Sequence, residues 1–234
     1  MRSPLTLAVA QPRCVPHDIE ANVREHARIV ALAGARVVVF PELSLTGYHF
    51  DAESIPANDS RLDPLVATCA EHGVIALAGA SVSTGADRHI AVLAVDGDGA
   101  SVAYRKMFLG SAEQAVFTPG GGPAVLDVDG CRIGLAICKD TGVAAQTDAA
   151  TALGIDVYAA GVLESIDDAD VQPERARGIV DRHHVWVAIA SFAGPTGEGY
   201  DRAAGGSAIW APDGRVVASA GADAGVWATA ALTP

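Results

Sequence analysis

The chain has 234 residues, of which half are hydrophobic and 19% are charged, and its formal net charge is -12 at pH 7. This length suits a single domain over residues 1–234, and the composition supports a sizeable hydrophobic core and argues against a disordered protein. The acidity argues against a nucleic-acid partner and against binding to an anionic membrane surface, because both require a basic face.

The cysteines and the N-terminal residues indicate where the protein resides. Cys14, Cys69, Cys131 and Cys138 lie far apart and lack CxxC spacing, which argues against a disulfide framework and against a zinc site. Residues 1–4 lack the apolar core of a signal peptide, and no apolar run approaches the ~20 residues of a membrane-spanning helix. We therefore expect a cytoplasmic protein whose cysteines are reduced thiols.

Hydrophobic periodicity predicts alternating strands and helices along the chain. Apolar runs predict strands at residues 5–10, 37–40, 74–82, 90–95, 101–104, 125–128, 132–137, 156–160, 185–191, 207–211, 216–219 and 226–230. Apolar residues spaced by three to four predict one helix that is capped by Asp18 or Asn22 and ended by Gly34. They also predict helices at 61–72, 142–153 and 173–183. Aspartate-glycine turns at 96–99, 129–130 and 212–214 predict hairpins. This order of elements predicts an α/β protein with mixed sheets covered by helices.

Residues 131–142, CRIGLAICKDTG, contain a buried strand that stops abruptly at Cys138. Thr141 is expected to cap the helix that follows, so that the thiol lies where a strand turns sharply into a helix. The positive end of that helix would favour the thiolate form of Cys138 over the thiol. Taken alone, this residue is either an exposed nucleophile or a structural cysteine packed in the core.

Two other strand ends carry groups that complement a thiol. Glu42 directly follows the apolar strand 37–40, and it is either a solvated loop acid or a working carboxylate at a sheet edge. Lys106 follows the hairpin that ends at Tyr104, and it is one of only two lysines among 16 basic residues. A lysine kept in so arginine-rich a chain indicates a role that a guanidinium group cannot fill.

A thiol, a carboxylate and an amine suffice for acyl transfer through a thioester. Glu42 can take the proton of Cys138 as a general base and return it to the leaving amine. The ammonium group of Lys106 and the backbone N–H of Lys139 can hold the oxyanion. Water that Glu42 activates can then cleave the thioester.

Three segments, PELSLTGY, YRKMFLGSAEQAVFTPG and GLAICKD, resemble in order the three signatures of the nitrilase superfamily, the carbon–nitrogen hydrolases. The resemblance extends over nearly the whole chain, through LTLAVAQ, RARGIVDRHHVWVAIAS and GGSAIWAPDGRVVA. It implies a four-layer αββα sandwich with two mixed β-sheets, a Glu-Lys-Cys triad at Glu42, Lys106 and Cys138, and an assisting glutamate at Glu113. It also implies catalysis without a metal or an organic cofactor, and pairing of two chains into a homodimer.

The chain departs from the family pattern at positions that usually shape the substrate pocket. Lys139 stands where an aromatic residue commonly follows the cysteine, Asp181-Arg182 replaces a Glu-Asn pair, and Ser191 replaces a frequent asparagine. These changes leave the triad intact and concern the choice of substrate. In 234 residues there is no room for the C-terminal arm of true nitrilases, which favours an amide over a nitrile as substrate.

Several residues near the motifs are candidates for the site, and each has an ordinary alternative. Glu113 is either an assisting acid or a loop acid, and Glu164 is either a partner for a cationic substrate or part of a solvated acidic rim. Lys139 steadies a substrate carboxylate, or lowers the pKa of the thiol, or points away from the pocket. Three aromatic residues line the pocket or pack in the core: Tyr48, Phe117 and Phe192. His183 and His184 are expected at a helix end, where a cation suits the dipole, and not beside the thiol.

The leading hypothesis is a hydrolase that cleaves a small linear amide or carbamoyl compound through a thioester on Cys138. Two alternatives remain at this point: a nitrile hydrolase, and a catalytically silent binding or scaffold protein on the same fold. Adduct formation on the thiol discriminates the enzymes from the silent protein, and paired nitrile and amide substrates discriminate the two enzymes.

Overall fold

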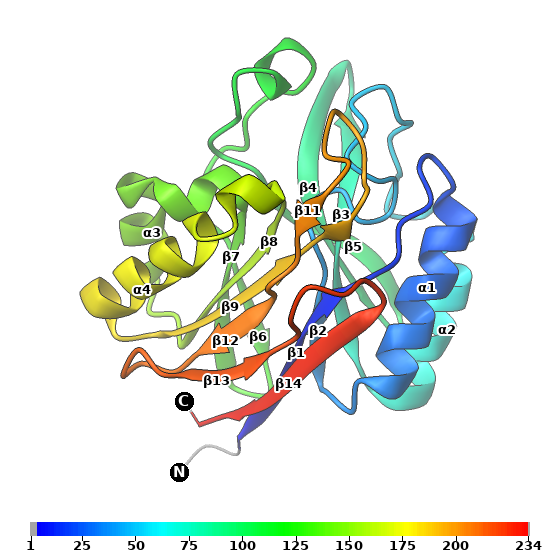
Figure 1. Ribbon diagram of the computed structural model, residues 1–234. Helices are drawn as coiled ribbons and strands as arrows, with labels where there is room; N and C mark the ends of the chain where they lie inside the picture. Colours follow the sequence, from blue (N-terminus) through cyan, green and yellow to red (C-terminus); the bar gives the residue numbers. More distant parts are fainter. Residues whose placement is uncertain (1–3, 234) are drawn as a thin grey trace.

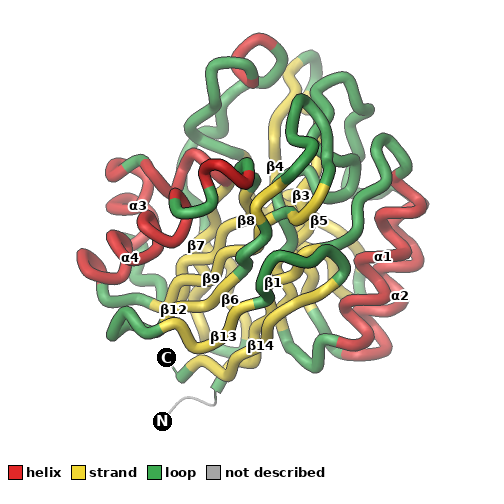
Figure 2. The backbone as a smooth tube through the Cα atoms, in the orientation of Figure 1, coloured by secondary structure: helices red, strands yellow, loops and turns green. Residues whose placement is uncertain are grey.

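The computed structural model describes residues 4–233, and it consists of two six-stranded sheets that face each other. Helices α1 (Ile19–Leu32) and α2 (Asp63–His72) cover the outer face of the first sheet, and α3 (Ala144–Thr151) and α4 (Val171–His183) cover the outer face of the second (Figure 1). In Figure 2 the helices form the two outer layers, and the strands fill the space between them. The order of layers is therefore αββα, as the sequence predicts.

Both sheets are mixed, with parallel strands in the middle and antiparallel strands at the edges. The first sheet has the order β14 (Val226–Leu232), β1 (Leu5–Gln11), β2 (Val37–Val39), β3 (Ile75–Thr84), β4 (Asp87–Asp96), β5 (Gly99–Arg105). The second has the order β13 (Val216–Ser219), β12 (Ala208–Trp210), β9 (Trp186–Ser191), β8 (Val157–Val162), β7 (Cys131–Ile137), β6 (Val125–Val128). Two short strands, β10 (Ala193–Gly194) and β11 (Ala203–Ala204), pair separately.

Alternation along the strands builds three apolar layers. In β1, Leu7 and Val9 face the second sheet, whereas Ala8 and Ala10 lie against the helical layer formed by α1 and α2. Successive side chains of a strand point to opposite faces, so a strand buried on both sides must be apolar throughout. The small alanines on the helical side let helix and sheet approach closely. Among residues 4–233, no helix has the length and apolar character needed to cross a membrane.

The structure decides between the two proposed caps of the first helix. The side chain of Asp18 accepts a hydrogen bond from the backbone N–H of Ala21 at 2.8 Å, so Asp18 is the N-cap. Asn22 lies inside the helix, where its amide bonds to the backbone of Val15 and Leu45 and ties the preceding loop to the sheet end.

The predicted helix 142–153 is wrong in its start and its cap. Cys138–Gly142 forms a short 3-10 helix, η3, and α3 begins only at Ala144. Thr141 does not cap α3, because its hydroxyl donates to the backbone carbonyl of Cys138 at 2.7 Å and contacts Gln172 of α4. A β-strand that enters a tight 3-10 turn directly cannot place the first α-helical residue at Gly142. The other predicted helices and strands are present, with ends shifted by a few residues.

Two glycines, one in each sheet, surround the segment that follows β2. A Cβ atom on Gly79 of β3 would lie 2.2 Å from the carbonyl oxygen of Pro41, and one on Gly161 of β8 would lie 2.5 Å from that of Phe40. Both neighbours are backbone atoms that cannot rotate away. The absence of side chains at Gly79 and Gly161 therefore lets the backbone before Glu42 pass between the two sheets.

Gly161→Ala should lower the free energy of unfolding by about 1–3 kcal/mol, because the added methyl group overpacks a buried backbone contact. Gly178 in α4 is the matched control, since a Cβ there meets nothing within 4 Å. Gly178→Ala should raise stability by about 0.5–1 kcal/mol through its helix propensity. Urea unfolding of both variants checks this, and equal effects of the two substitutions would contradict the close packing around Phe40 and Glu42.

Candidate active site

Glu42 lies at the carboxyl end of β2, buried between the sheets with 1% of its surface exposed. Its Oε1 atom accepts a hydrogen bond from the Nζ atom of Lys106 at 2.6 Å. Its Oε2 atom is buried and has no hydrogen-bond partner among the described residues. A carboxylate oxygen in this state is available to accept a proton from a group that enters the site.

Lys106 follows β5 and is as deeply buried as Glu42. Besides Glu42, its Nζ atom donates to the Oε1 atom of Glu113 at 2.8 Å. A buried ammonium group requires opposite charges close by, because its transfer out of water costs several kcal/mol. The two carboxylates provide them, so that Lys106 joins the end of β2 to the loop after β5.

Glu113 begins the short helix η2 (Glu113–Ala115) and is also buried. Its Oε1 atom accepts a hydrogen bond from the hydroxyl of Tyr48 at 2.6 Å, and its Oε2 atom accepts one from the backbone N–H of Gly110 at 2.6 Å. Together with Lys106, these donors fix both carboxylate oxygens. Glu113 thus holds Lys106 in place and is itself held by Tyr48.

Cys138 occupies the junction of β7 and η3 in a left-handed backbone conformation, with φ of +41°. Such a conformation is strained for a residue with a side chain and is found where a side chain must be presented at a turn. The residue as a whole is partly exposed, and its Sγ atom lies 3.4 Å from the carbonyl oxygen of Leu163. As a residue, Cys138 is thus less deeply buried than Glu42 and Lys106.

Asp140 connects this turn to the segment that carries Lys106. Its carboxylate accepts hydrogen bonds from the backbone N–H groups of Ile137 at 3.0 Å and Phe108 at 2.9 Å, and from the hydroxyl of Tyr104 at 2.7 Å. It is fully buried. These three bonds tie the turn at Cys138 to both sides of Lys106.

The charges in the site shift the pKa values of its groups in opposite directions. Burial raises the pKa of Glu42 to about 8, and the charges of Glu113 and Asp140 add to this effect against that of Lys106. Burial also opposes ionisation of Glu113, but the Lys106 ammonium and hydrogen-bond donors outweigh it and lower its pKa. Burial alone would lower the pKa of Lys106, yet the neighbouring acidic groups raise it. Lys106 and Glu113 are hence ionised at neutral pH, and Glu42 exchanges its proton near neutrality.

The expectation that Cys138 rests as a thiolate is wrong. Burial and the nearby charges of Glu42 and Glu164 raise the pKa of its thiol, and only Lys106 and a hydrogen bond oppose them. The expected helix dipole is also weaker, because a 3-10 turn and no α-helix follows directly. A neutral thiol needs a base at the moment of attack, and Glu42 is close enough to influence its titration.

The remaining candidate residues differ in how they relate to the thiol. Glu164 is half-buried, influences the titration of Cys138, and accepts a hydrogen bond from the Gln172 amide at 2.8 Å, so it is not a fully solvated acid. Lys139 donates to the carbonyl oxygen of Leu109 at 2.7 Å, which fastens it to the loop before Glu113. Whether Glu164 and Lys139 bind the substrate stays a prediction.

The aromatic candidates also occupy different places. Tyr48 supports Glu113, and its ring packs edge-on against Phe50 and Tyr200. Phe117 packs against Phe50 under the guanidinium group of Arg88. Phe192 has no exposed surface and belongs to the core between the sheets.

Two features of the site were missed by the sequence analysis. The first is Tyr200, which contacts Tyr48 and is near enough to Cys138 for the two groups to influence each other's titration. The second is the anchoring role of Asp140. A signal existed for Asp140, which follows Cys138 by two residues in the polar segment after an apolar strand, but no local pattern pointed to Tyr200. His183 and His184 lie at the end of α4, as expected.

Comparison with known proteins identifies the family of this chain. The sequence profile of the carbon-nitrogen hydrolase family matches residues 6–233. The chain belongs to the carbon–nitrogen hydrolase family. It is therefore a nitrilase-superfamily protein, as its three motifs indicate.

Several individual proteins are similar to this carbon–nitrogen hydrolase over most of its length. The hydrolase Rv0480c of Mycobacterium tuberculosis is 30% identical over 242 residues, which cover 93% of this chain and 85% of the relative. An (R)-stereoselective amidase of a Pseudomonas species is 30% identical over 80% of this chain and 69% of its own. The NitN amidase of Nesterenkonia sp. AN1 superposes with a TM-score of 0.82 at 25% identity, over 98% of this chain and 93% of the amidase. Nit3 of Saccharomyces cerevisiae, at 20% identity and a TM-score of 0.87 over 99% and 91% of the two chains, shares the fold.

Lys106→Met should destabilise the protein by about 3–5 kcal/mol at pH 7, because it leaves buried carboxylates without their counter-ion. The triple variant Glu42→Gln, Lys106→Met, Glu113→Gln should recover much of this loss, since it removes the remaining charges. The free energy of unfolding in urea checks both. A triple variant as unstable as the single one would contradict the assignment of Lys106 as the charge that balances Glu42 and Glu113.

Proposed function

We propose that this carbon–nitrogen hydrolase cleaves a small linear amide or carbamoyl compound through a thioester on Cys138, releasing ammonia or an amine. The observation that carries the proposal is the arrangement around Lys106, which is held between Glu42 and Glu113 while the Oε2 atom of Glu42 keeps no partner among the described residues. The charges of Glu42 and Lys106 also influence the titration of Cys138, which supports a site that combines a base, a cation and a thiol. The Pseudomonas and Nesterenkonia relatives, both named as amidases, support an amide substrate.

The acylation step uses Glu42 as base and then as acid. Its Oε2 atom takes the proton of the Cys138 thiol as the sulfur attacks the carbonyl carbon of the substrate, so a C–S bond forms and the oxygen becomes negative. The ammonium group of Lys106 and the backbone N–H of Lys139 stabilise that oxygen, each by roughly 3 kcal/mol on the scale of oxyanion-hole donors. Glu42 then gives its proton to the leaving nitrogen, the C–N bond breaks, and a thioester remains.

Hydrolysis repeats the same proton path with water. Glu42 takes a proton from water as the water oxygen attacks the thioester carbonyl, and the C–S bond breaks. The sulfur of Cys138 regains a proton, and a carboxylic acid leaves. Glu113 acts by holding Lys106 and the wall of the site, where Tyr48 and Gly110 bind its carboxylate.

The domain organisation, the cellular location, the oligomeric state and the partner of this protein are proposals as well. A single domain over residues 1–234 fits the family match over residues 6–233. A cytoplasmic location fits the four cysteines, all of which are present as thiols, and a homodimer fits the resemblance to the family. A small-molecule amide is the proposed partner, and the reaction as written needs no cofactor.

Cys138→Ala should abolish turnover of amides, since no other group in the site can form the thioester. Cys69→Ala, which removes a buried thiol from α2, is the matched control and should keep activity near the wild-type level. The measurement is release of ammonia across a panel of short amides, each offered beside the corresponding nitrile. Preference for the nitriles would identify a nitrile hydrolase in place of an amidase. Amide turnover by Cys138→Ala would contradict the proposed mechanism.

The rate constant kcat/KM should rise with pH and level off above about pH 8, because Glu42, whose pKa burial raises to about 8, is a base only after it loses its proton. Glu42→Gln should lower kcat/KM by about 10²–10⁴-fold and flatten this profile. Circular dichroism of the variant checks that the fold persists. A profile with the same inflection in Glu42→Gln would assign the titration to another group.

Peptide mapping by mass spectrometry gives a further readout of the nucleophile. Iodoacetamide should label Cys138 faster than Cys14, Cys69 or Cys131, because Cys138 alone has a base beside it in the proposed mechanism. Glu42→Gln should slow labelling of Cys138 and leave labelling of the other cysteines unchanged. Equal rates at all four thiols would argue for a silent protein on this fold.

A further inference from the structure

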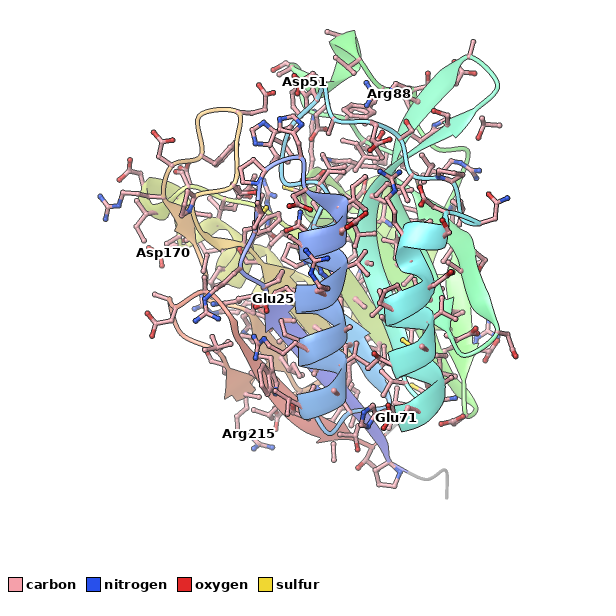
Figure 3. The ribbon with its side chains drawn as sticks, turned by 90° about the vertical axis from the view of Figure 1, so that its right-hand side faces the viewer. Glu25, Asp51, Glu71, Arg88, Asp170 and Arg215 are labelled. Atoms are coloured by element: carbon pink, nitrogen blue, oxygen red, sulfur yellow. The ribbon has the colours of Figure 1, made fainter. Side chains whose placement is uncertain are left out.

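Two histidines and an aspartate, none of them among the site residues described above, gather at the end of the molecule where α1 begins. His17, His49 and Asp51 each offer one ligand atom, and these atoms lie within 4.8 Å of one another. In Figure 3, Asp51 is labelled on a loop at this end of the molecule, beyond the first turn of α1. The cluster takes part in neither the proton path nor the buried ion pairs described above.

Two separate chain segments are already fastened together at this cluster. The backbone N–H of His17 donates to the carbonyl oxygen of Thr46 at 2.9 Å, which joins the turn before α1 to the segment after Glu42. The rings of His17 and His49 lie 4.3 Å apart between centroids, and the Nε2 atom of His17 is 3.8 Å from the Oδ1 atom of Asp51. The three side chains therefore meet because the backbone brings them together.

Packing, and not hydrogen bonding, holds the ring of His49. A Cβ atom on Gly197 would lie 2.5 Å from the Nε2 atom of His49, and one on Gly47 would lie 3.2 Å from its Cδ2 atom. The Nε2 atom is buried and has no hydrogen-bond partner in the part of the chain that the structure describes. A polar ring fixed in this way without a protein partner is what a preorganised ligand requires.

The charge around the cluster favours a cation. The carboxylate of Asp51 is exposed, and Glu198 binds the neighbouring backbone N–H of Phe50 at 3.3 Å. Arg61 lines the same surface hollow as His17, but its guanidinium group is bound by Asp59 and Glu53 and so is balanced by their carboxylates. A divalent ion would thus meet an acidic surface on a chain of net charge -12.

We propose that His17, His49 and Asp51 form a binding site for a divalent transition-metal ion of the zinc class, separate from the hydrolytic site. Two imidazoles and one carboxylate are a ligand set of Zn²⁺, with water at the remaining position. Ligand atoms around Zn²⁺ lie roughly 3.3 Å apart at zinc–nitrogen distances of about 2.0–2.1 Å, so the side chains must close slightly. The side chains of His17 and Asp51 are 47% and 82% exposed and are free to do so.

The proposed metal site adjoins a residue that supports the hydrolytic site, but metal binding does not require the hydrolytic reaction. Tyr48 directly precedes His49, and its hydroxyl donates to Glu113. An ion held by His17 and His49 would fasten the segment that carries Tyr48 to the turn before α1. Binding itself is measurable whether or not the protein hydrolyses amides.

The test is a zinc titration of the Cys138→Ala protein, in which the reactive thiol cannot take the metal. Competition with a chromophoric zinc chelator should show one ion bound per chain, and thermal unfolding should shift upward with zinc. His17→Ala and Asp51→Asn, both at exposed positions, should each weaken binding about tenfold or more, as loss of one ligand of three requires. His72→Ala removes an exposed histidine at the end of α2 and should leave the affinity unchanged.

Cobalt substitution identifies the ligand atoms. Co²⁺ at this site should give weak visible bands, without the strong near-ultraviolet absorption of a thiolate ligand, although Cys14 lies close to Gly47. Absence of stoichiometric zinc binding, an affinity in His17→Ala and Asp51→Asn unchanged from that of the Cys138→Ala parent, or a thiolate band would each overturn the proposal. None of these results depends on amide turnover, so failure of the metal site and failure of the proposed hydrolysis are distinguishable.

Discussion

The contact between the Lys106 ammonium group and two buried carboxylates is the interaction on which the rest of the structure depends. A charge of this kind is stable inside a protein only when opposite charges and hydrogen bonds replace its water. Glu42 and Glu113 provide that replacement at 2.6 and 2.8 Å. Since each comes from a different segment, the ion pairs require the end of β2, the end of β5 and the loop at η2 to meet. The ion pairs of the site therefore both result from the packing of these segments and stabilise it.

The two sheets make this meeting possible through small residues and one buried acid. Gly79 and Gly161 leave the space through which the backbone reaches Glu42, one glycine from each sheet. Asp140 holds the turn at Cys138 against the backbone of Phe108, beyond Lys106. The left-handed conformation of Cys138 is therefore supported by hydrogen bonds on both sides of the turn. This rigidity places a neutral thiol next to groups that can take its proton.

The hydrophobic pattern predicts the α/β class and the three strand ends, because apolar runs stand out and polar groups follow them, whereas the four layers were implied by the resemblance to the nitrilase superfamily. Glu42 and Cys138 have this signature, whereas Lys106 follows a partly exposed strand and was distinguished by the scarcity of lysine. The support of Glu113 by Tyr48 is beyond such reasoning, because the two residues are 65 positions apart and no local pattern joins them. The state of the thiol was also wrongly predicted, because it depends on the sum of burial and two acidic neighbours, whereas the sequence shows only the local turn. The cluster of His17, His49 and Asp51 likewise arises from tertiary contacts.

The account requires that the charges around Lys106 turn the neutral thiol of Cys138 into an acyl acceptor. Rapid chemical quenching of the enzyme during turnover of a short amide, followed by mass spectrometry, tests this most directly. The account predicts an added mass equal to the acyl group on the peptide that contains Cys138, and transfer of that group to hydroxylamine when it is present. Amide consumption without an acylated cysteine, and without hydroxamate formation in hydroxylamine, would contradict it.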